Sequence, residues 1–182
     1  MALVVDSDPL SATCNSYVSV QVMDDYVADR VPDPAVKVAW DALTDPQQAM
    51  YLVNATRSID SYASWIGRKY TREQSLDWPR YDAWVDGYML DVSIVPPAVI
   101  EATCEMVVWM MQNAGVVAVQ QNAAFDSIKV GPIAIDFNEG AGGSKEKYFP
   151  DIVAVIIGDL GTMSNPTLPS STSVRVVRIS RA

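Results

Sequence analysis

The sequence predicts a mainly α-helical protein: a small helical bundle with a long central helix, a short β element and extended N- and C-terminal arms. Three observations predict this fold class. Several segments repeat apolar residues at helical spacing and carry capping signals at their ends. One later segment alternates apolar and polar residues, as a strand does. Polar, proline-containing stretches lie towards both ends of a chain that is 49% hydrophobic, which is enough to form a core.

We expect three parts in the 182 residues. Residues 1–16 form an N-terminal arm, which either adds to a sheet or stays loosely attached. Residues 17–160 form the helical domain, with the β element near residues 127–137. Residues 161–182 form a linker and a basic, β-prone tail, which pairs either with the β element of its own chain or with a strand outside its own core.

Two helices are predicted near the start of the domain. The first spans Tyr17–Arg30, with Ser19 as a plausible N-cap, and it ends where two prolines occur in Val31–Pro34. Its apolar stripe consists of Val18, Val22 and Tyr26. A shorter helix is expected at Ala35–Leu43, and its Trp40 is expected in the core.

The longest helix is expected to begin after Thr44, which forms a capping box with Gln47. Apolar residues recur at helical spacing from Ala49 onward, and this pattern extends the helix to Ile66. Gly67 follows and suits a left-handed C-terminal cap.

The remaining elements follow a long connection. A helix beginning with a proline is predicted at Pro97–Asn113. The alternation at Ile128–Phe137 predicts a strand, with Gly131-Pro132 as a bulge or bend. A last short helix is predicted at Pro150–Leu160.

The connection at residues 68–97 is too long and too aromatic to be a simple exposed loop. We expect Trp78 to anchor it between the two long helices, Pro79 to fix its exit direction and Arg80 to face an acidic neighbour. Trp84 and Tyr88 are candidate interface residues, because such large side chains need a covering surface.

The composition argues against several functions. The chain has no histidine and two cysteines, so we expect no catalytic residues, no metal site and no cofactor, and we do not expect an enzyme. The paired carboxylates of Glu101 and Glu105 are interpreted as a solvated helix face. No apolar run is long enough to span a bilayer and no secretory signal is seen, so we expect a soluble protein of cytosolic origin without membrane contact.

The net charge of −9 is unevenly distributed. The last acidic residue is Asp159, and three arginines follow in the tail. An acidic body with a basic, partly apolar tail predicts that the tail docks onto a partner. The candidate docking residues are Val174, Arg175, Val177, Arg178, Ile179 and Arg181.

A family resemblance is carried by a set of residues spread over residues 17–160. These are Tyr17–Val20 with Tyr26; Trp40; Ala55–Arg57 with Ile59 and Asp60; Gly67 and Arg68; Gln74-x-Leu76-x-Trp78-Pro79-Arg80; Val95 and Pro96 with Val99, Ala102, Thr103 and Glu105; and Ile128–Gly131 with Ile133. In this order they resemble the head-to-tail connector proteins of tailed bacteriophages, also called adaptor or head-completion proteins. Some members are catalogued as DnaT-like single-stranded-DNA-binding proteins. The N-terminal arm and the basic tail depart from the pattern.

The resemblance implies a structural virion protein of the phage neck, assembled in the host cytoplasm. It implies a homo-oligomeric ring, usually of twelve copies, which joins the portal protein to a tail or nozzle protein. Genomic DNA would pass through the acidic channel without specific binding.

The alternative is a single-stranded-DNA-binding or replication-accessory protein, which needs cations beside aromatic stacking platforms. Aromatic residues are present, and Arg68, Lys69, Arg72 and Arg80 form a local basic cluster. Three acidic residues dilute this cluster, namely Glu73, Asp77 and Asp82. The overall negative charge also weighs against phosphate binding.

Overall fold

The computed structural model of the chain describes residues 4–113, 119–120, 127–130, 133–136 and 146–164. The helices in these ranges are α1 (Val20–Arg30), α2 (Pro34–Asp41), α3 (Asp45–Tyr62), α4 (Pro97–Gln112) and α5 (Asp151–Ile157). The first five strands are β1 (Ala63–Trp65), β2 (Arg68–Lys69), β3 (Arg80–Tyr81), β4 (Trp84–Val85) and β5 (Tyr88–Met89). The later strands are β6 (Val119–Gln120), β7 (Ser127–Val130), β8 (Ile133–Asp136), β9 (Glu146–Lys147) and β10 (Gly161–Met163).

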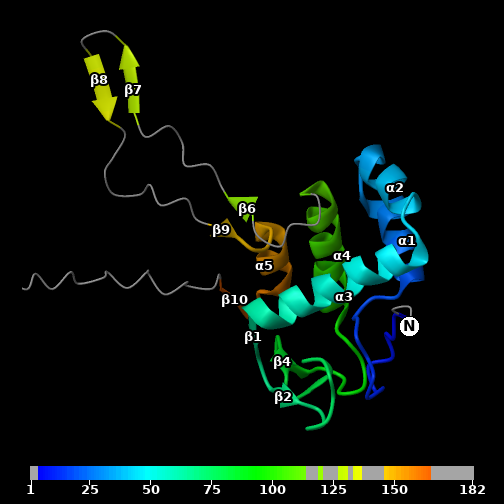
Figure 1. Ribbon diagram of the computed structural model, residues 1–182. Coiled ribbons are helices and arrows are strands. Elements are labelled where there is room, and N and C mark those ends of the chain that lie inside the picture. Colours follow the sequence, from blue (N-terminus) through cyan, green and yellow to red (C-terminus); the bar gives the residue numbers. More distant parts are fainter. Residues whose placement is uncertain (1–3, 114–118, 121–126, 131–132, 137–145, 165–182) are drawn as a thin grey trace, which may run out of the picture.

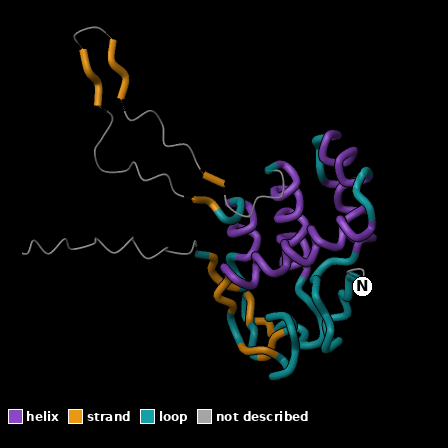
Figure 2. The backbone as a smooth tube through the Cα atoms, in the orientation of Figure 1, coloured by secondary structure: helices purple, strands orange, loops and turns teal. Residues whose placement is uncertain are grey.

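Helix α3 runs across the molecule between the other helices and a region of short strands and loops (Figure 1). It packs against α4, and α4 packs against α5. Figure 2 shows the strands and loops between α3 and α4 gathered on the side of α3 opposite α4 and α5. The expectation of a helical protein with short β elements is therefore confirmed.

The core is formed by side chains from all five helices and from the connection that precedes α4. Its largest fully buried members include Trp40, Trp78, Met23, Leu52, Ile59, Met106 and Ile157. The Trp40 indole N–H donates a hydrogen bond to Asp24 Oδ1 at 2.6 Å, which satisfies the polar atom of a ring buried in the core. Burial of this apolar surface is the main stabilising contribution to the fold.

The predicted apolar stripe of α1 is right in part, because Val18 is buried ahead of the helix and Tyr26 packs against the core. Met23 and Val27 are buried in the core, whereas Val22 is exposed. The hydroxyl of Tyr26 donates to Glu105 Oε1 at 2.5 Å, and Arg30 pairs with Glu101 at 2.6 Å. Glu101 and Glu105 of α4 were expected to form only a solvated helix face, but their carboxylates bind side chains of α1.

Helix α3 begins where the sequence predicts, since Gln47 Oε1 accepts a hydrogen bond from the Thr44 amide at 2.9 Å. It is 18 residues long and ends at Tyr62, so the expected long helix to Ile66 is not formed. The next residues leave the helix as strand β1, which pairs antiparallel with β10 near the other end of the described chain. Gly67 has the predicted positive φ, 67°, but it lies in the turn before β2 rather than at a helix cap.

The connection before α4 contains two antiparallel strand pairs, β2 with β3 and β4 with β5. We refer to residues 67–90 as the β2–β5 unit. Asp86 and Gly87 form the turn between β4 and β5, and both have positive φ, 51° and 81°. An Asp-Gly dipeptide in this conformation matches the twist of a two-residue hairpin.

The later β segment also differs from the prediction. Residues 127–136 form two strands, β7 and β8, which pair with each other instead of forming one bent strand. Strand β6 pairs with β9. Strand β10 occupies the beginning of the expected linker, and the predicted docking residues of the tail, Val174 to Arg181, lie outside the described residues. None of the described helices combines the length and apolarity that crossing a membrane requires.

Candidate nucleic-acid interface

The β2–β5 unit carries the exposed aromatic side chains of the protein. Tyr70, Tyr81, Trp84 and Tyr88 are 45%, 41%, 57% and 77% exposed. Among the described residues, every aromatic side chain in the exposed class belongs to this unit. Exposed aromatic rings are unusual enough on a monomer surface to indicate a binding surface.

The strand pairing of β2 and β3 explains one part of this surface. Arg68 lies opposite Tyr81 in the register, and its guanidinium lies over the Tyr81 ring, 4.9 Å from the ring centre. Such a cation–π contact holds the guanidinium over the face of an exposed aromatic ring. The pair therefore presents an aromatic surface and a positive charge at the same place.

The β4–β5 hairpin presents the other two rings. Trp84 lies opposite Met89, and Val85 lies opposite Tyr88. Because side chains alternate along a strand, Trp84 and Tyr88 emerge from opposite faces of the hairpin. Val85 is half-buried against the core and fixes the orientation of the hairpin.

Some of the exposed cations near the unit form ion pairs with carboxylates and others do not. Arg68 pairs with Asp82 at 3.1 Å, and Lys69 pairs with Asp77 at 3.0 Å. Arg72 in the unit and Arg57 on α3 are exposed and form no ion pair within the described part of the chain. Exposed ion pairs contribute little free energy, so a phosphate can replace the carboxylate partners at low cost.

Arg80 does not face an acidic neighbour as the sequence predicts. Its guanidinium donates hydrogen bonds to three main-chain carbonyl oxygens: Ile66 at 2.6 Å, Gly67 at 2.8 Å and Asp77 at 3.1 Å. Arg80 therefore joins the turn before β2 to the loop before β3. It is a structural cation and is less available to a ligand than the other three of its predicted cluster.

Trp78 is only 1% exposed and belongs to the same buried cluster as side chains of α3 and α4. Its ring packs edge-on against Trp65, with centres 5.6 Å apart. Its amide N–H donates to the hydroxyl of Tyr17 at 3.1 Å, and the peptide bond to Pro79 is cis. These contacts hold the base of the β2–β5 unit against the helical core.

A half-buried carboxylate lies next to the same loop. Asp60 on α3 accepts hydrogen bonds from the Tyr17 hydroxyl at 2.6 Å and from the Asp77 amide at 3.2 Å. Burial raises the pKa of Asp60 to about 6, against the lowering effect of the Tyr17 hydrogen bond. No group of three or more acidic or cysteine side chains is placed to hold a metal ion in the ranges that the structure describes.

Sequence reasoning identified Trp84 and Tyr88 as interface candidates, left Tyr81 between a core and an interface role, and missed Tyr70. The overlooked signal is Asp86-Gly87, an Asp-Gly pair between two short apolar segments, which predicts a hairpin. A hairpin there implies that the aromatic residues around it lie on strands with exposed faces.

The fold and this surface define a class: a helical domain that presents aromatic rings and a few cations on a small β unit. A family model described as "Putative DnaT-like ssDNA binding protein" matches residues 1–179. The chain belongs to this family. No curated protein and no solved structure matches the chain.

The family match corrects the main interpretation of the sequence. The description of the family is that of a single-stranded-DNA-binding protein. The interpretation as a structural protein of the phage neck is therefore wrong. The expected partners, portal and tail proteins, and the expectation that DNA passes through a channel without specific binding are wrong with it. The virion location and the absence of enzymatic activity stay predictions.

Proposed function

We propose that this protein binds single-stranded DNA through the β2–β5 unit. The observation that carries the proposal is the gathering of the exposed aromatic side chains of the described chain on this one unit, beside Arg68, Lys69 and Arg72. Bases stack on aromatic rings without regard to sequence, and nearby cations follow the phosphates. The family description supports the same ligand.

The surface favours single strands over duplexes. In a duplex the faces of the bases are stacked on one another, so exposed rings such as Trp84 and Tyr88 find nothing to stack on. A protein with a net charge of −9 also gains little from phosphate contacts alone. Stacking is therefore the larger part of the binding free energy in this proposal.

Trp84 provides a direct test, because all five tryptophans are described and Trp84 is the one in the exposed class. Titration with a labelled dT12 oligonucleotide should quench its fluorescence as a base stacks on the indole. Trp84→Phe should keep most of the affinity and lose most of the quenching. Trp84→Ala should weaken binding by about 1–3 kcal/mol, measured by fluorescence anisotropy.

Two controls keep this test specific. Trp109→Phe changes a half-buried ring on α4 and should leave both quenching and affinity unchanged. A duplex of the same length should compete poorly for the labelled oligonucleotide. If Trp84→Ala and Tyr88→Ala bind dT12 as the wild type does, the β2–β5 unit is not the binding site.

A further inference from the structure

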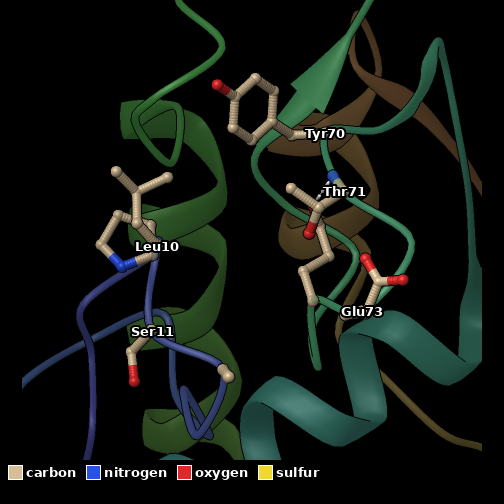
Figure 3. A pocket seen from close by; sticks show the side chains of 8 residues that line it. Leu10, Ser11, Tyr70, Thr71 and Glu73 are labelled. Atoms are coloured by element: carbon tan, nitrogen blue, oxygen red, sulfur yellow. Dashed lines mark hydrogen bonds between the residues drawn. The ribbon is translucent and has the colours of Figure 1, made fainter.

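A pocket of about 250 Å³ lies between the N-terminal segment and the start of the β2–β5 unit (Figure 3). It is lined by Pro9, Leu10, Ser11, Ala12, Tyr70, Thr71, Glu73 and Gln74. We propose that this pocket takes one nucleobase that carries an exocyclic amino group from the bound single strand. The proposal rests on the proposed function and adds a base preference to it.

The N-terminal wall of the pocket is held in shape by one carboxylate. Asp6 Oδ2 accepts hydrogen bonds from the hydroxyls of Ser11 at 2.6 Å and Thr13 at 2.7 Å. Asp6 also fixes the chain through its main-chain oxygen, which accepts from the Asn15 amide at 2.9 Å. This compact loop presents Leu10 towards the pocket, as Figure 3 shows.

The opposite wall is held in shape by the Gln74 amide. Its oxygen accepts from the Thr71 amide at 2.8 Å, and its nitrogen donates to the carbonyls of Leu76 at 2.9 Å and Pro79 at 3.0 Å. The Ser75 hydroxyl donates to the Cys14 carbonyl and so joins the two walls. Because both walls are fixed by internal hydrogen bonds, a ligand entering the pocket has little ordering cost to overcome.

The walls offer apolar faces to a flat ligand. Leu10 is 59% exposed and Tyr70 is 45% exposed, and their side chains lie on either side of the opening in Figure 3. The volume is below the usual range of about 300–1,000 Å³ for drug-sized ligands, which suits a single base. Tyr70 belongs to the exposed aromatic set and also lines the pocket, so a base stacked on Tyr70 lies beside the pocket.

Glu73 supplies the base preference. This exposed residue lines the pocket, and its carboxylate makes no hydrogen bond or ion pair among the described residues. An ionised carboxylate only accepts hydrogen bonds, so it pairs with the amino groups of cytosine, adenine or guanine. Thymine presents carbonyl oxygens at the corresponding positions, and two acceptors repel each other.

The first experiment compares dC12 with dT12 by fluorescence anisotropy on the full chain. The wild type should bind dC12 about tenfold more tightly, the lower end of the effect of one hydrogen bond to a charged group. Glu73→Gln should bring the ratio close to one, because an amide can donate to thymine as well as accept from cytosine. Asp86→Asn is the matched control: it removes one charge from the same unit outside the pocket, so it should change both affinities together and keep the ratio.

A second variant tests the cavity itself. Ala12→Phe fills the space from an exposed position in the N-terminal wall and should abolish the dC12 preference while dT12 binding persists. Circular dichroism verifies that both variants fold. A wild-type ratio of one, or a ratio unchanged by Glu73→Gln and Ala12→Phe, overturns the base pocket while Trp84-dependent binding of dT12 still supports the proposed function. If the wild type binds neither oligonucleotide, the proposed function fails and the base pocket fails with it.

Discussion

At the scale of single residues, Asp60 is a carboxylate whose pKa is raised by its surroundings. It is a half-buried carboxylate that accepts hydrogen bonds from the Tyr17 hydroxyl and the Asp77 amide. The pKa of Tyr17 lies well above its ordinary value because the ring is buried and Asp60 is close. Asp77 raises the pKa of Asp60 further, whereas Lys69 lowers it. Asp60 therefore joins α3, the N-terminal segment and the β2–β5 unit at one point.

The raised pKa of Asp60 predicts a pH dependence of stability. The folded state holds the proton more tightly than the unfolded state, so the contribution is complete below pH 3.8 and is lost as the pH rises through about 6. The difference between 3.8 and about 6 is worth at most about 3 kcal/mol. Asp60→Asn imitates the protonated form, and the free energy of unfolding of the wild type relative to this variant should fall from pH 4 to pH 7, measured by urea unfolding.

Asp91→Asn is the control for this pH series. Hydrogen bonds from Ser93 lower the pKa of Asp91, so its contribution to stability is complete well above its ordinary pKa of 3.8 and is lost as the pH falls below that value. Between pH 5 and pH 7 the difference between wild type and Asp91→Asn should be flat. A flat difference for Asp60→Asn as well would show that Asp60 titrates normally in the folded protein.

Residue-scale roles could be predicted only where size and polarity decide them. Trp40 is a core residue because its ring is too large to leave in water, and the sequence predicts this directly. The sequence predicts an acidic partner for Arg80, yet its guanidinium donates to three carbonyl oxygens at the turns before β2 and β3. Those three carbonyl oxygens come together only after the strands have paired. No local sequence pattern therefore predicts that Arg80 binds them.

At the scale of elements, two glycines that both need a positive φ test how tightly β2 and β3 are packed. Gly67 and Gly87 both have positive φ, 67° and 81°. A Cβ on Gly87 meets no atom within 4 Å, whereas a Cβ on Gly67 would lie 2.4 Å from the Tyr81 carbonyl oxygen. Gly87→Ala should therefore lower the free energy of unfolding by about 1–2 kcal/mol, the cost of the left-handed conformation.

Gly67→Ala should cost at least about 2 kcal/mol more, because the oxygen that it meets belongs to the backbone of β3 and cannot swing away. Urea unfolding of the two variants measures the difference. The same variant should also weaken dT12 binding, since displacing β3 from β2 moves Tyr81 and Arg68. Equal costs for the two glycines would show that β2 and β3 can separate without penalty.

The starts of elements were predictable and several of their ends were not. Ser19, Thr44 and Pro97 mark helix starts through capping chemistry that acts within a few residues. The end of α3 depends on β10, which pairs with β1 from nearly a hundred positions further along the chain. The apolar pattern continues to Ile66, but the hydrogen bonds that β10 offers outweigh the helical pattern after Tyr62.

At the scale of the whole molecule, the distribution of charge decides how the protein meets DNA. The chain has 13 lysines and arginines against 22 acidic residues. Several of the described cations are already paired, including Arg30, Lys37 and Lys147 on the helical side of the molecule. The acidic balance repels phosphates in general, so productive encounters are restricted to the surface where cations and exposed rings coincide.

This distribution predicts a shallow dependence of binding on salt. For single strands, log K falls with log salt with a slope of about −0.7 for each phosphate neutralised, so Arg68, Lys69 and Arg72 together account for a slope of about −2. Replacing all three by Gln should remove about that much of the slope while leaving the Trp84 quenching in place, because stacking is insensitive to salt. Anisotropy titrations with dT12 between about 50 and 200 mM salt measure both quantities.

The matched control is the triple variant Arg30→Gln, Lys37→Gln and Lys147→Gln. It changes the net charge from −9 to −12, as the first triple variant does, but at cations outside the β2–β5 unit. If phosphates are bound at the unit, this control keeps the wild-type slope and weakens binding only through the overall field. Equal loss of slope in the two variants would mean that the net charge of the molecule, and not the placement of cations beside the aromatic rings, governs the interaction with single-stranded DNA.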